Sequence, residues 1–405
     1  MSGMRTYGMR TLVCRGVFFC AALLPTLAVA AWSTWRATSD ASQYYADQIA
    51  YQLGGHVAID DVEYLAPGSY RLIGMRLCDA ENDGPLLETT AVTIDFAPTL
   101  DHRDATFTSV TLESATLHHE RIGELWLMLH PRMLRQRDFP PRPIELTCPE
   151  LELVGRDGTQ RLHNVRFYMQ QLEQGPQLRV EFHLANGQLG SAVYPITIEI
   201  SRVASSTSPV TRVVLHTHGQ PFPCHLLTGD LAWISRLGDL VQFEGTANMY
   251  HEHEGWSGSL NGTFSGLDLD RLAHPNQQPS ISGPATCQVR SANWSRGVLN
   301  YLNATVSAGP GIVATDTIHH AVDRWNCRLL PDADVPGSQV RYEELRAEVH
   351  LLRDEKLRIY GVCEEHPETV LRTLHGPLLR QPAAPLSDIR MSLPAAARAI
   401  LAELP

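Results

Sequence analysis

Apolar and polar side chains alternate with a period of two over much of this chain. The clearest runs cover residues 92–96, 178–184, 196–200 and 345–351. In the second run, Leu178, Val180 and Phe182 are separated by charged residues. A period of two turns the apolar side chains to one face of a strand and the polar ones to the other. That arrangement is typical of an antiparallel sheet with one buried face.

Short turn sequences separate these runs, and they contain the Asp-Gly and Asn-Gly pairs that favour tight hairpins. Such pairs begin at Asp83, Asp157, Asn186 and Asn261. The sequence shows no long series of strands alternating with amphipathic helices, which argues against a doubly wound α/β fold. The predicted fold class is therefore mainly β. We expect an elongated antiparallel sheet, which forms a groove if its apolar face stays uncovered, and a few short helices.

Two helices have clear sequence signals. Asp40 can cap a helix in which apolar residues recur every four positions as far as Leu53. Thr315 or Asp316 can cap a second, with apolar residues at i, i+3, i+4 and i+7 from Ile318 to Trp325. Weaker candidates cover residues 122–134, 226–237 and 394–404.

Near the N-terminus an uncharged apolar segment runs from Gly16 to Trp35. Roughly 20 helical residues at about 1.5 Å each cover a hydrocarbon core about 30 Å thick. Arginines precede the segment, so its N-terminal side should stay in the cytoplasm and the body should face outward. The sequence therefore predicts a transmembrane anchor. The residues expected to fix it in the bilayer are Arg15, Val17, Phe18, Phe19, Leu23, Leu24, Trp32 and Trp35.

A cleaved secretory signal is the alternative interpretation of this segment. Ala28-Val29-Ala30 matches a signal peptidase site, and Pro25 can break the helix just before it. A retained anchor is favoured because the apolar character continues through Trp32 and a helical pattern follows. Both interpretations place the bulk of the chain outside the cytoplasm.

Proline-rich breaks at residues 139–143 and 274–284 suggest how the chain divides. We predict a cytoplasmic basic tail and then the anchor, followed by a membrane-proximal helix with a first β module. A central β module and a C-terminal β module with helices complete the chain. The corresponding ranges are 1–15, 16–35, 36–138, 144–274 and 280–405.

Composition narrows the classes of function. The chain of 405 residues has 43% hydrophobic and 19% charged residues, which indicates a globular body. Its net charge of −11 argues against a nucleic-acid-binding surface. Six cysteines lie outside the N-terminal segment, far apart and without a C-x-x-C pair. They are compatible either with one to three disulfides or with buried single thiols.

Paired histidines are the strongest signal for chemistry. His216 and His218 form one H-x-H pair, and His251 and His253 form another. Two imidazoles on one strand face can ligate a metal if a third ligand comes from elsewhere. Candidates for that third ligand are His118, His119, His319 and His320. Because the chain has 18 histidines, we favour solvated strand faces and predict no metal site and no cofactor.

Motifs typical of enzymes are missing from the sequence. It contains no G-x-S-x-G, H-E-x-x-H or G-x-x-x-x-G-K-[ST] pattern. The acidic pairs Asp268/Asp270 and Asp332/Asp334 are more simply explained as helix-capping or loop acids. We therefore expect that the protein is not an enzyme.

Several glycine-and-leucine patterns resemble AsmA/TamB-like bacterial envelope proteins. After Leu53-Gly54-Gly55 come Val57-Ala58-Ile59, Pro67-Gly68, residues 72–77, residues 84–87 and a strand at 92–96. A second similar stretch covers residues 256–272 and continues through 281–283 and 309–312 into the helix at Asp316. These stretches cover about a quarter of the chain. Many relatives are far longer, and no specific functional residue can be transferred from them.

The resemblance implies a single-pass inner-membrane protein with a periplasmic β-rich body. It suggests a role in cell-envelope biogenesis that involves shielding or transferring lipid acyl chains along a β-groove. Phospholipid and the inner membrane are the expected partners, with other envelope proteins unspecified. A structural or adaptor ectodomain without ligand is the alternative, and a metal-dependent enzyme using the H-x-H strands is less favoured.

Overall fold

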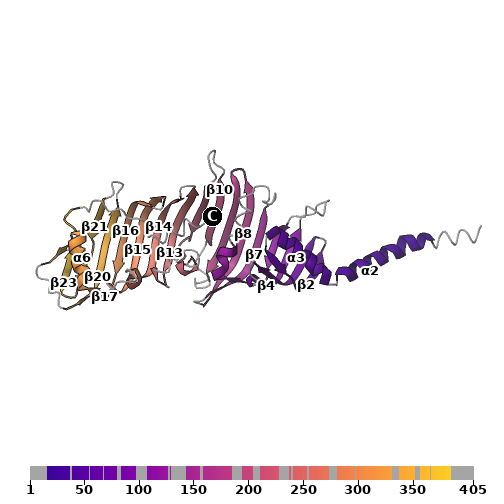
Figure 1. Cartoon of the computed structure of the whole chain (residues 1–405), viewed down its shortest axis with the longest axis horizontal. Coiled ribbons are helices and arrows are strands. Elements are labelled where there is room, and N and C mark those ends of the chain that lie inside the picture. Colours follow the sequence, from indigo (N-terminus) through magenta and orange to yellow (C-terminus); the bar gives the residue numbers. More distant parts are fainter. Residues whose placement is uncertain are drawn as a thin grey trace, which may run out of the picture. The chain divides into compact units, whose positions relative to one another are not determined.

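The computed structural model describes most of the chain outside its two ends (Figure 1). The described residues are 16–36, 39–53, 55–66, 68–79, 84–96, 107–125, 128, 143–155, 158–184, 194–203, 210–227, 237–238, 240–252, 255–272, 281–296, 298–330, 337–351, 356–364 and 366–384. They belong to two compact units, Met1–Thr116 and Leu117–Pro405. The predicted ranges 36–138, 144–274 and 280–405 stay predictions.

The first unit contains a small antiparallel sheet with a helix against it. Its elements are η1 (Phe19–Leu23), α2 (Leu24–Arg36), α3 (Ser39–Leu53), β1 (His56–Ala58), β2 (Asp61–Ala66), β3 (Ser69–Cys78), β4 (Pro85–Phe96) and β5 (Phe107–Leu112). Strand β3 pairs with β1, β2 and β4, and β4 pairs with β5. Strand β6 (Ala115–His118) lies at the boundary between the units.

Helix α3 is held on this sheet by an apolar stripe. Ala46 and Ile49 are buried, and the ring of Tyr45 lies 4.9 Å from the ring of Tyr70 on β3. Ile49 is three positions after Ala46 and four after Tyr45, so these residues of α3 lie on one side of the helix, and that side faces the sheet. This confirms the helix that the sequence predicts after Asp40.

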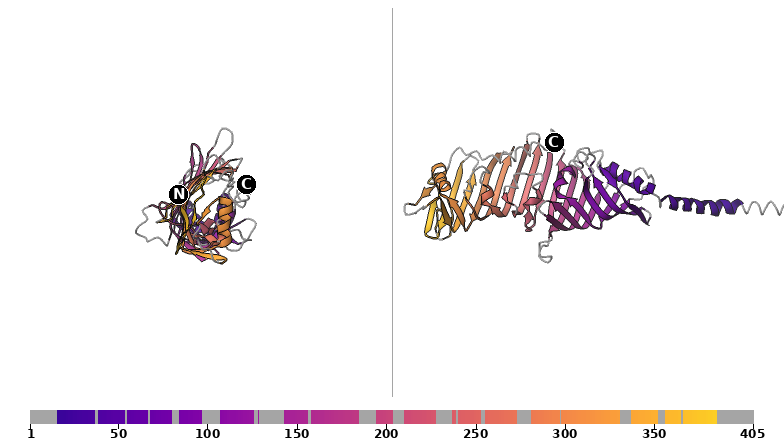
Figure 2. Two further views of the ribbon diagram at one scale, coloured as in Figure 1. Left: turned by 90° about the vertical axis from the view of Figure 1, so that its left-hand side faces the viewer. Right: turned by 60° about the horizontal axis from the view of Figure 1, so that its bottom comes forward.

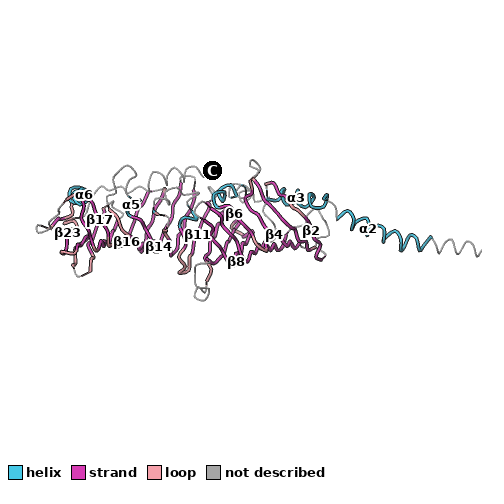
Figure 3. The backbone as a smooth tube through the Cα atoms, turned by 90° about the horizontal axis from the view of Figure 1, so that it is seen from below, coloured by secondary structure: helices cyan, strands magenta, loops and turns pink. Residues whose placement is uncertain are grey.

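The second unit is built mainly from one antiparallel sheet whose strands follow one another largely in chain order. Strands β7 to β11, β13 to β16, β20 and β21 are successive neighbours (Figures 1 and 3). Their bounds are β7 (Ile144–Gly155), β8 (Gly158–Leu172), β9 (Gly175–Leu184), β10 (Ile196–Val203), β11 (Val210–His216), β13 (Gln242–Glu252), β14 (Gly255–Asp268), β15 (Pro284–Ser295), β16 (Val298–Ala308), β20 (Glu344–Leu351) and β21 (Leu357–Gly361). The mainly β prediction is confirmed.

Smaller elements complete the second unit. Short strands β12 (Phe222–Pro223), β18 (Arg328–Leu329), β22 (Thr369–Thr373) and β23 (Gly376–Arg380) join the large sheet, while β17 (Gly311–Ala314) and β19 (Gln339–Tyr342) form a two-stranded sheet. The helices are η3 (His119–Arg121), η4 (Cys224–Leu227), α5 (Leu269–Leu272) and α6 (Thr315–Trp325). Helix α6 confirms the predicted helix at Thr315. The predicted helix at 394–404 lies outside the described residues.

Two other predicted helices are described in part. Within 122–134, residues 122–125 and 128 are helical, and the others are outside the described residues. Within 226–237, the residues up to Leu227 belong to the 3₁₀ turn η4, and Leu237 is also in a 3₁₀ conformation. Both described ends of this segment are thus helical, and residues 228–236 lie outside the described residues.

A closed hydrophobic core lies at the C-terminal strands, where α6 packs on the sheet (Figure 2). Ile318 and Ala321 of α6 are buried together with Tyr342, Leu371 and Leu379. The amphipathic spacing of α6 brings its apolar stripe onto these side chains. This end of the sheet is thereby covered by a second layer.

Candidate functional site

A row of apolar side chains crosses the large sheet of the second unit from strand to strand. Directly opposed residues of antiparallel strands place their side chains on the same face. The strand register makes a continuous series of such partners, which we call the central row. Its members are Leu146, Phe167, Val180, Ile198, Leu215, Ala247, Leu260, Ala292, Leu302, Leu351 and Leu357.

The face that carries the central row, here called the apolar face, is covered unevenly. Leu351 and Leu357 are buried at one end, whereas Phe167, Val180 and Ile198 are half-buried. A neighbouring row of partners is also mostly half-buried, and it consists of Met169, Leu178, Ile200, Val213 and Met249. A second layer of protein would bury such central positions almost completely. Leu178 and Ala247 are nevertheless buried, so the apolar face between β8 and β13 is partly accessible.

The opposite face of the same strands is polar. Arg166, Glu181, Thr197, His216 and Thr246 form a row of partners there. Ion pairs tie neighbouring strands together on this face, as when Arg179 contacts Glu181 and lies 3.8 Å from Glu199. The strands thus have a polar face with charged side chains and an apolar face that carries the central row.

A second hydrophobic cluster covers another part of the apolar face. It is formed by the buried residues Cys224, Val241, Phe243, Leu267, Leu269 and Ala285. Leu215 and Leu260 of the central row pack against it. These residues come from η4, from α5 and from positions at or next to the ends of β13, β14 and β15. The cluster therefore covers the apolar face along the edge where these strand ends lie. Ile198 and Ile200 themselves lie outside it.

The predicted anchor residues lie in the N-terminal helical stretch of the first unit. Residues 16–36 have helical backbone throughout, with the π-helical turn η1 inside it. Val17, Phe18, Phe19 and Leu24 expose between 58% and 66% of their surface. Leu23 is half-buried, Trp32 and Trp35 lie in α2, and Arg15 is outside the described residues.

None of the helices in the described residues is at once long enough and apolar enough to cross a membrane.

The described members of the two histidine pairs do not converge. His216 lies on the polar face, where its Nδ1 is 3.1 Å from Thr246 Oγ1, and His218 stacks on it. His251 lies on the apolar face, half-buried, with its ring 4.9 Å from that of Trp256. His251 is thus partly exposed, and the prediction that both pairs lie on solvated strand faces stays a prediction. His253 is outside the described residues, and no metal-binding group of three or more His, Cys, Asp or Glu residues occurs within them.

The other histidines considered as third ligands are dispersed. His119 Nε2 lies 2.7 Å from the carbonyl oxygen of Leu226, beside a cavity of about 140 Å³ that His225 also lines. His319 and His320 are exposed on α6. Asp268 and Asp270 lie at the start of α5. The carboxylate of Asp268 caps this helix, since the Asp270 amide donates to Asp268 Oδ1 at 3.1 Å. Asp332 and Asp334 lie outside the described residues.

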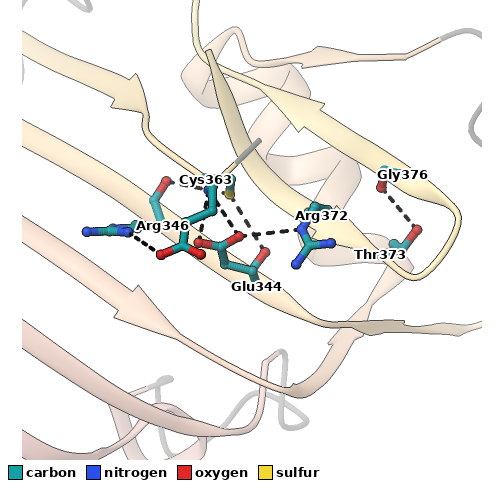
Figure 4. A network of polar contacts seen from close by, with 7 residues as sticks. Glu344, Arg346, Cys363, Arg372, Thr373 and Gly376 are labelled. Atoms are coloured by element: carbon teal, nitrogen blue, oxygen red, sulfur yellow. Dashed lines mark hydrogen bonds and ion pairs between the residues drawn. The ribbon is translucent and has the colours of Figure 1, made fainter. Parts of the chain in front are cut away.

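A polar network on the C-terminal strands has a structural role (Figure 4). The Glu364 amide donates to the Glu344 carboxylate at 3.2 Å, and Arg372 Nε lies 3.4 Å from the same group. Arg346 Nη1 donates to Glu364 Oε1 at 3.5 Å. The carboxylate of Glu344 therefore ties β20 to β22 and to the segment after β21. Every charged group of this network has an opposite charge beside it, so it offers no free group for chemistry.

No family model, curated protein or solved structure matches this chain.

The candidate site is thus the apolar face. Alternation within single strands predicts its existence, because Val180 and Ile198 stand out in the sequence. The alignment of eleven strands into one row depends on register, and no sequence pattern within a strand contains that information.

Proposed function

We propose that this protein binds lipid acyl chains on the apolar face of its second unit, while its N-terminal segment holds it in a membrane. The observation that carries the proposal is the partly accessible central row between β8 and β13. Each CH₂ group removed from water contributes about 0.8 kcal/mol, so a few ordered carbons of an acyl chain on this row give measurable affinity. The polar face keeps the same strands soluble on their other side.

The location that fits this function is the bacterial cell envelope. The resemblance to AsmA/TamB-like proteins and the arginine-rich N-terminal flank support an inner-membrane anchor with the body in the periplasm. Exposed side chains such as Phe18 and Phe19 favour the same assignment, because a free apolar helix surface is stabilised by contact with lipid. In this role the protein shields or transfers lipid and performs no catalysis.

A scaffold without ligand is the second candidate function. It is favoured by the C-terminal part of the sheet, where α6 closes the apolar face into an ordinary core. The two functions predict different effects of a charged substitution on the central row. On an open face, a charge repels acyl chains at little cost to folding, whereas an unpaired charge in a closed core costs about 2 kcal/mol or more.

The test places aspartate at Val180 or Ile198 in the full-length protein. We expect the wild-type protein to co-purify with lipid, measured by mass spectrometry of an organic extract. The V180D and I198D variants should lose most of that lipid while their Tm stays within a few degrees of the wild type.

The matched control is Q288D, because Gln288 is exposed on β15 and pairs with Thr263 and Thr305 on the polar face. This variant should keep both lipid and Tm. If V180D and I198D unfold, and the wild type never carries lipid, the scaffold function replaces lipid binding.

A further inference from the structure

A polar cluster interrupts the apolar face at one end of four neighbouring strands. Arg202 on β10, Thr211 on β11, His251 on β13 and Trp256 on β14 are successive register partners. Arg202 is two residues beyond Ile200 on the same strand, so the cluster lies on the apolar face and not on the polar one. A charged side chain on an apolar face costs free energy unless it is paired or reaches water.

The cluster presents hydrogen-bond donors without an acidic partner. Arg202 Nη1 donates to Thr211 Oγ1 at 3.0 Å, and no described carboxylate acts on the charge of Arg202. Trp256 is 9% exposed, and its Nε1 is buried without a hydrogen-bond partner among the described residues. A buried indole N–H without a partner costs free energy, and in most proteins such a donor is paired.

Electrostatics agree with this arrangement. Burial lowers the pKa of Arg202, and no described acid raises it. Burial, and after it the charge of Arg202, lowers the pKa of His251. The imidazole is therefore neutral near pH 7 and packs on Trp256 as a ring, while the guanidinium remains the cation of the cluster.

The next row along the strands is apolar. Ile200, Val213 and Met249 are register partners on the same face and are half-buried. Two residues along a strand correspond to about 6.6 Å, which is the spacing between the polar cluster and this row. One bound molecule can therefore place an anionic group on Arg202 and an aliphatic chain on its neighbours.

We propose that Arg202, Thr211 and Trp256 bind the phosphate group of a lipid whose acyl chains lie on the neighbouring apolar rows. The planar guanidinium offers paired donors that match phosphate oxygens, and the indole N–H supplies one more. This assignment rests on the proposed function and adds a site on this chain for the anionic headgroup.

The test measures binding by calorimetry with the full-length protein in an uncharged detergent. The probes are dihexanoyl phosphatidic acid, the uncharged dihexanoylglycerol and inorganic phosphate. The variants are R202Q, which removes the charge, and W256F, which removes the N–H and keeps an aromatic ring. The control is R212Q, since Arg212 is an exposed arginine on the polar face of β11. Tm is measured for every variant.

We expect wild-type protein to bind dihexanoyl phosphatidic acid more tightly than dihexanoylglycerol. R202Q should weaken the acidic lipid about tenfold or more, and W256F about threefold, as expected for charged and neutral hydrogen bonds. R212Q should bind like the wild type, and no variant should change the affinity for dihexanoylglycerol. Should R202Q fail to fold, the W256F result decides alone.

The other outcomes separate this inference from the proposed function. Equal affinity for the two lipids, or unchanged binding by R202Q and W256F, overturns the phosphate site and leaves acyl-chain binding standing. Inorganic phosphate bound as tightly as the acidic lipid, and lost in R202Q, shows an anion site that is not a lipid site. If none of the three probes binds, both proposals are overturned.

Discussion

The sequence alone does not show whether the six cysteines outside the N-terminal segment form disulfides or are buried single thiols. The described cysteines, from Cys78 to Cys363, are all free. Burial raises the pKa of Cys224 to about 12 and that of Cys287 to about 11, because both thiols lie in the hydrophobic cluster on the apolar face. Their spacing alone was equally compatible with disulfides, since only the packing around each sulfur decides between the two.

The raised pKa values predict the response to alkaline pH. A thiol in the unfolded chain titrates at about pH 8.5. Between that pH and about pH 11 the folded state binds more protons than the unfolded state, so stability is full below this window and falls as pH rises through it. Urea unfolding at pH 7.5 and pH 10 should show this loss, with C224A/C287A as the comparison. An identical decline in that variant would assign the loss to other groups.

Tyr342 provides a test of one buried hydrogen bond. Its side chain is fully buried, and its hydroxyl donates to the carbonyl oxygen of Ser282 at 2.7 Å. Y342F removes the donor and leaves that carbonyl without this bond, which should cost about 1 kcal/mol in the free energy of unfolding. Y360F is a matched control, since Tyr360 lies half-buried on the polar face. A loss no larger than that of the control would contradict a role for the hydroxyl.

At the scale of elements, α6 shows what a helical pattern can and cannot reveal. Its amphipathic spacing predicts both the helix and its buried stripe, and the structure confirms Ile318 and Ala321 as core residues. The partners of that stripe on β22 and β23 come from more than 40 residues away and could not be deduced. Local propensity determines the face of an element, and tertiary packing determines what covers it.

Stability should depend strongly on the buried side of helix α6, because this helix covers the apolar face at its C-terminal end. Ile318 is 1% exposed, so I318A should cost about 2 to 5 kcal/mol through lost burial and the cavity it leaves. H319A on the exposed side of the same helix should change stability by about 0.5 kcal/mol or less. Thermal melts of both variants measure this. Equal effects would mean that α6 is not docked on the sheet in solution.

At the scale of the whole molecule, the sequence predicts the fold class and the two faces of the sheet. It does so because alternation survives in almost every long strand, as in β9 and β10. It does not predict the polar cluster at Arg202, since its four members lie on different strands and come together only through register. Neighbours across strands, and not neighbours in sequence, decide burial.

The N-terminal segment has exposed apolar side chains, which require a lipid environment in the proposed function. The full-length protein should stay with membranes after carbonate washing, with residues 36–405 accessible to protease from the outer face. An arginine near the centre of a spanning helix costs about 2.5 to 3.5 kcal/mol, so L24R should be released more readily. T34R is the control, because an arginine near the end of the segment can extend to the interface. Sequencing of the mature protein decides between anchor and signal. A new N-terminus at Ala31 would show that the segment is cleaved and that the protein is secreted.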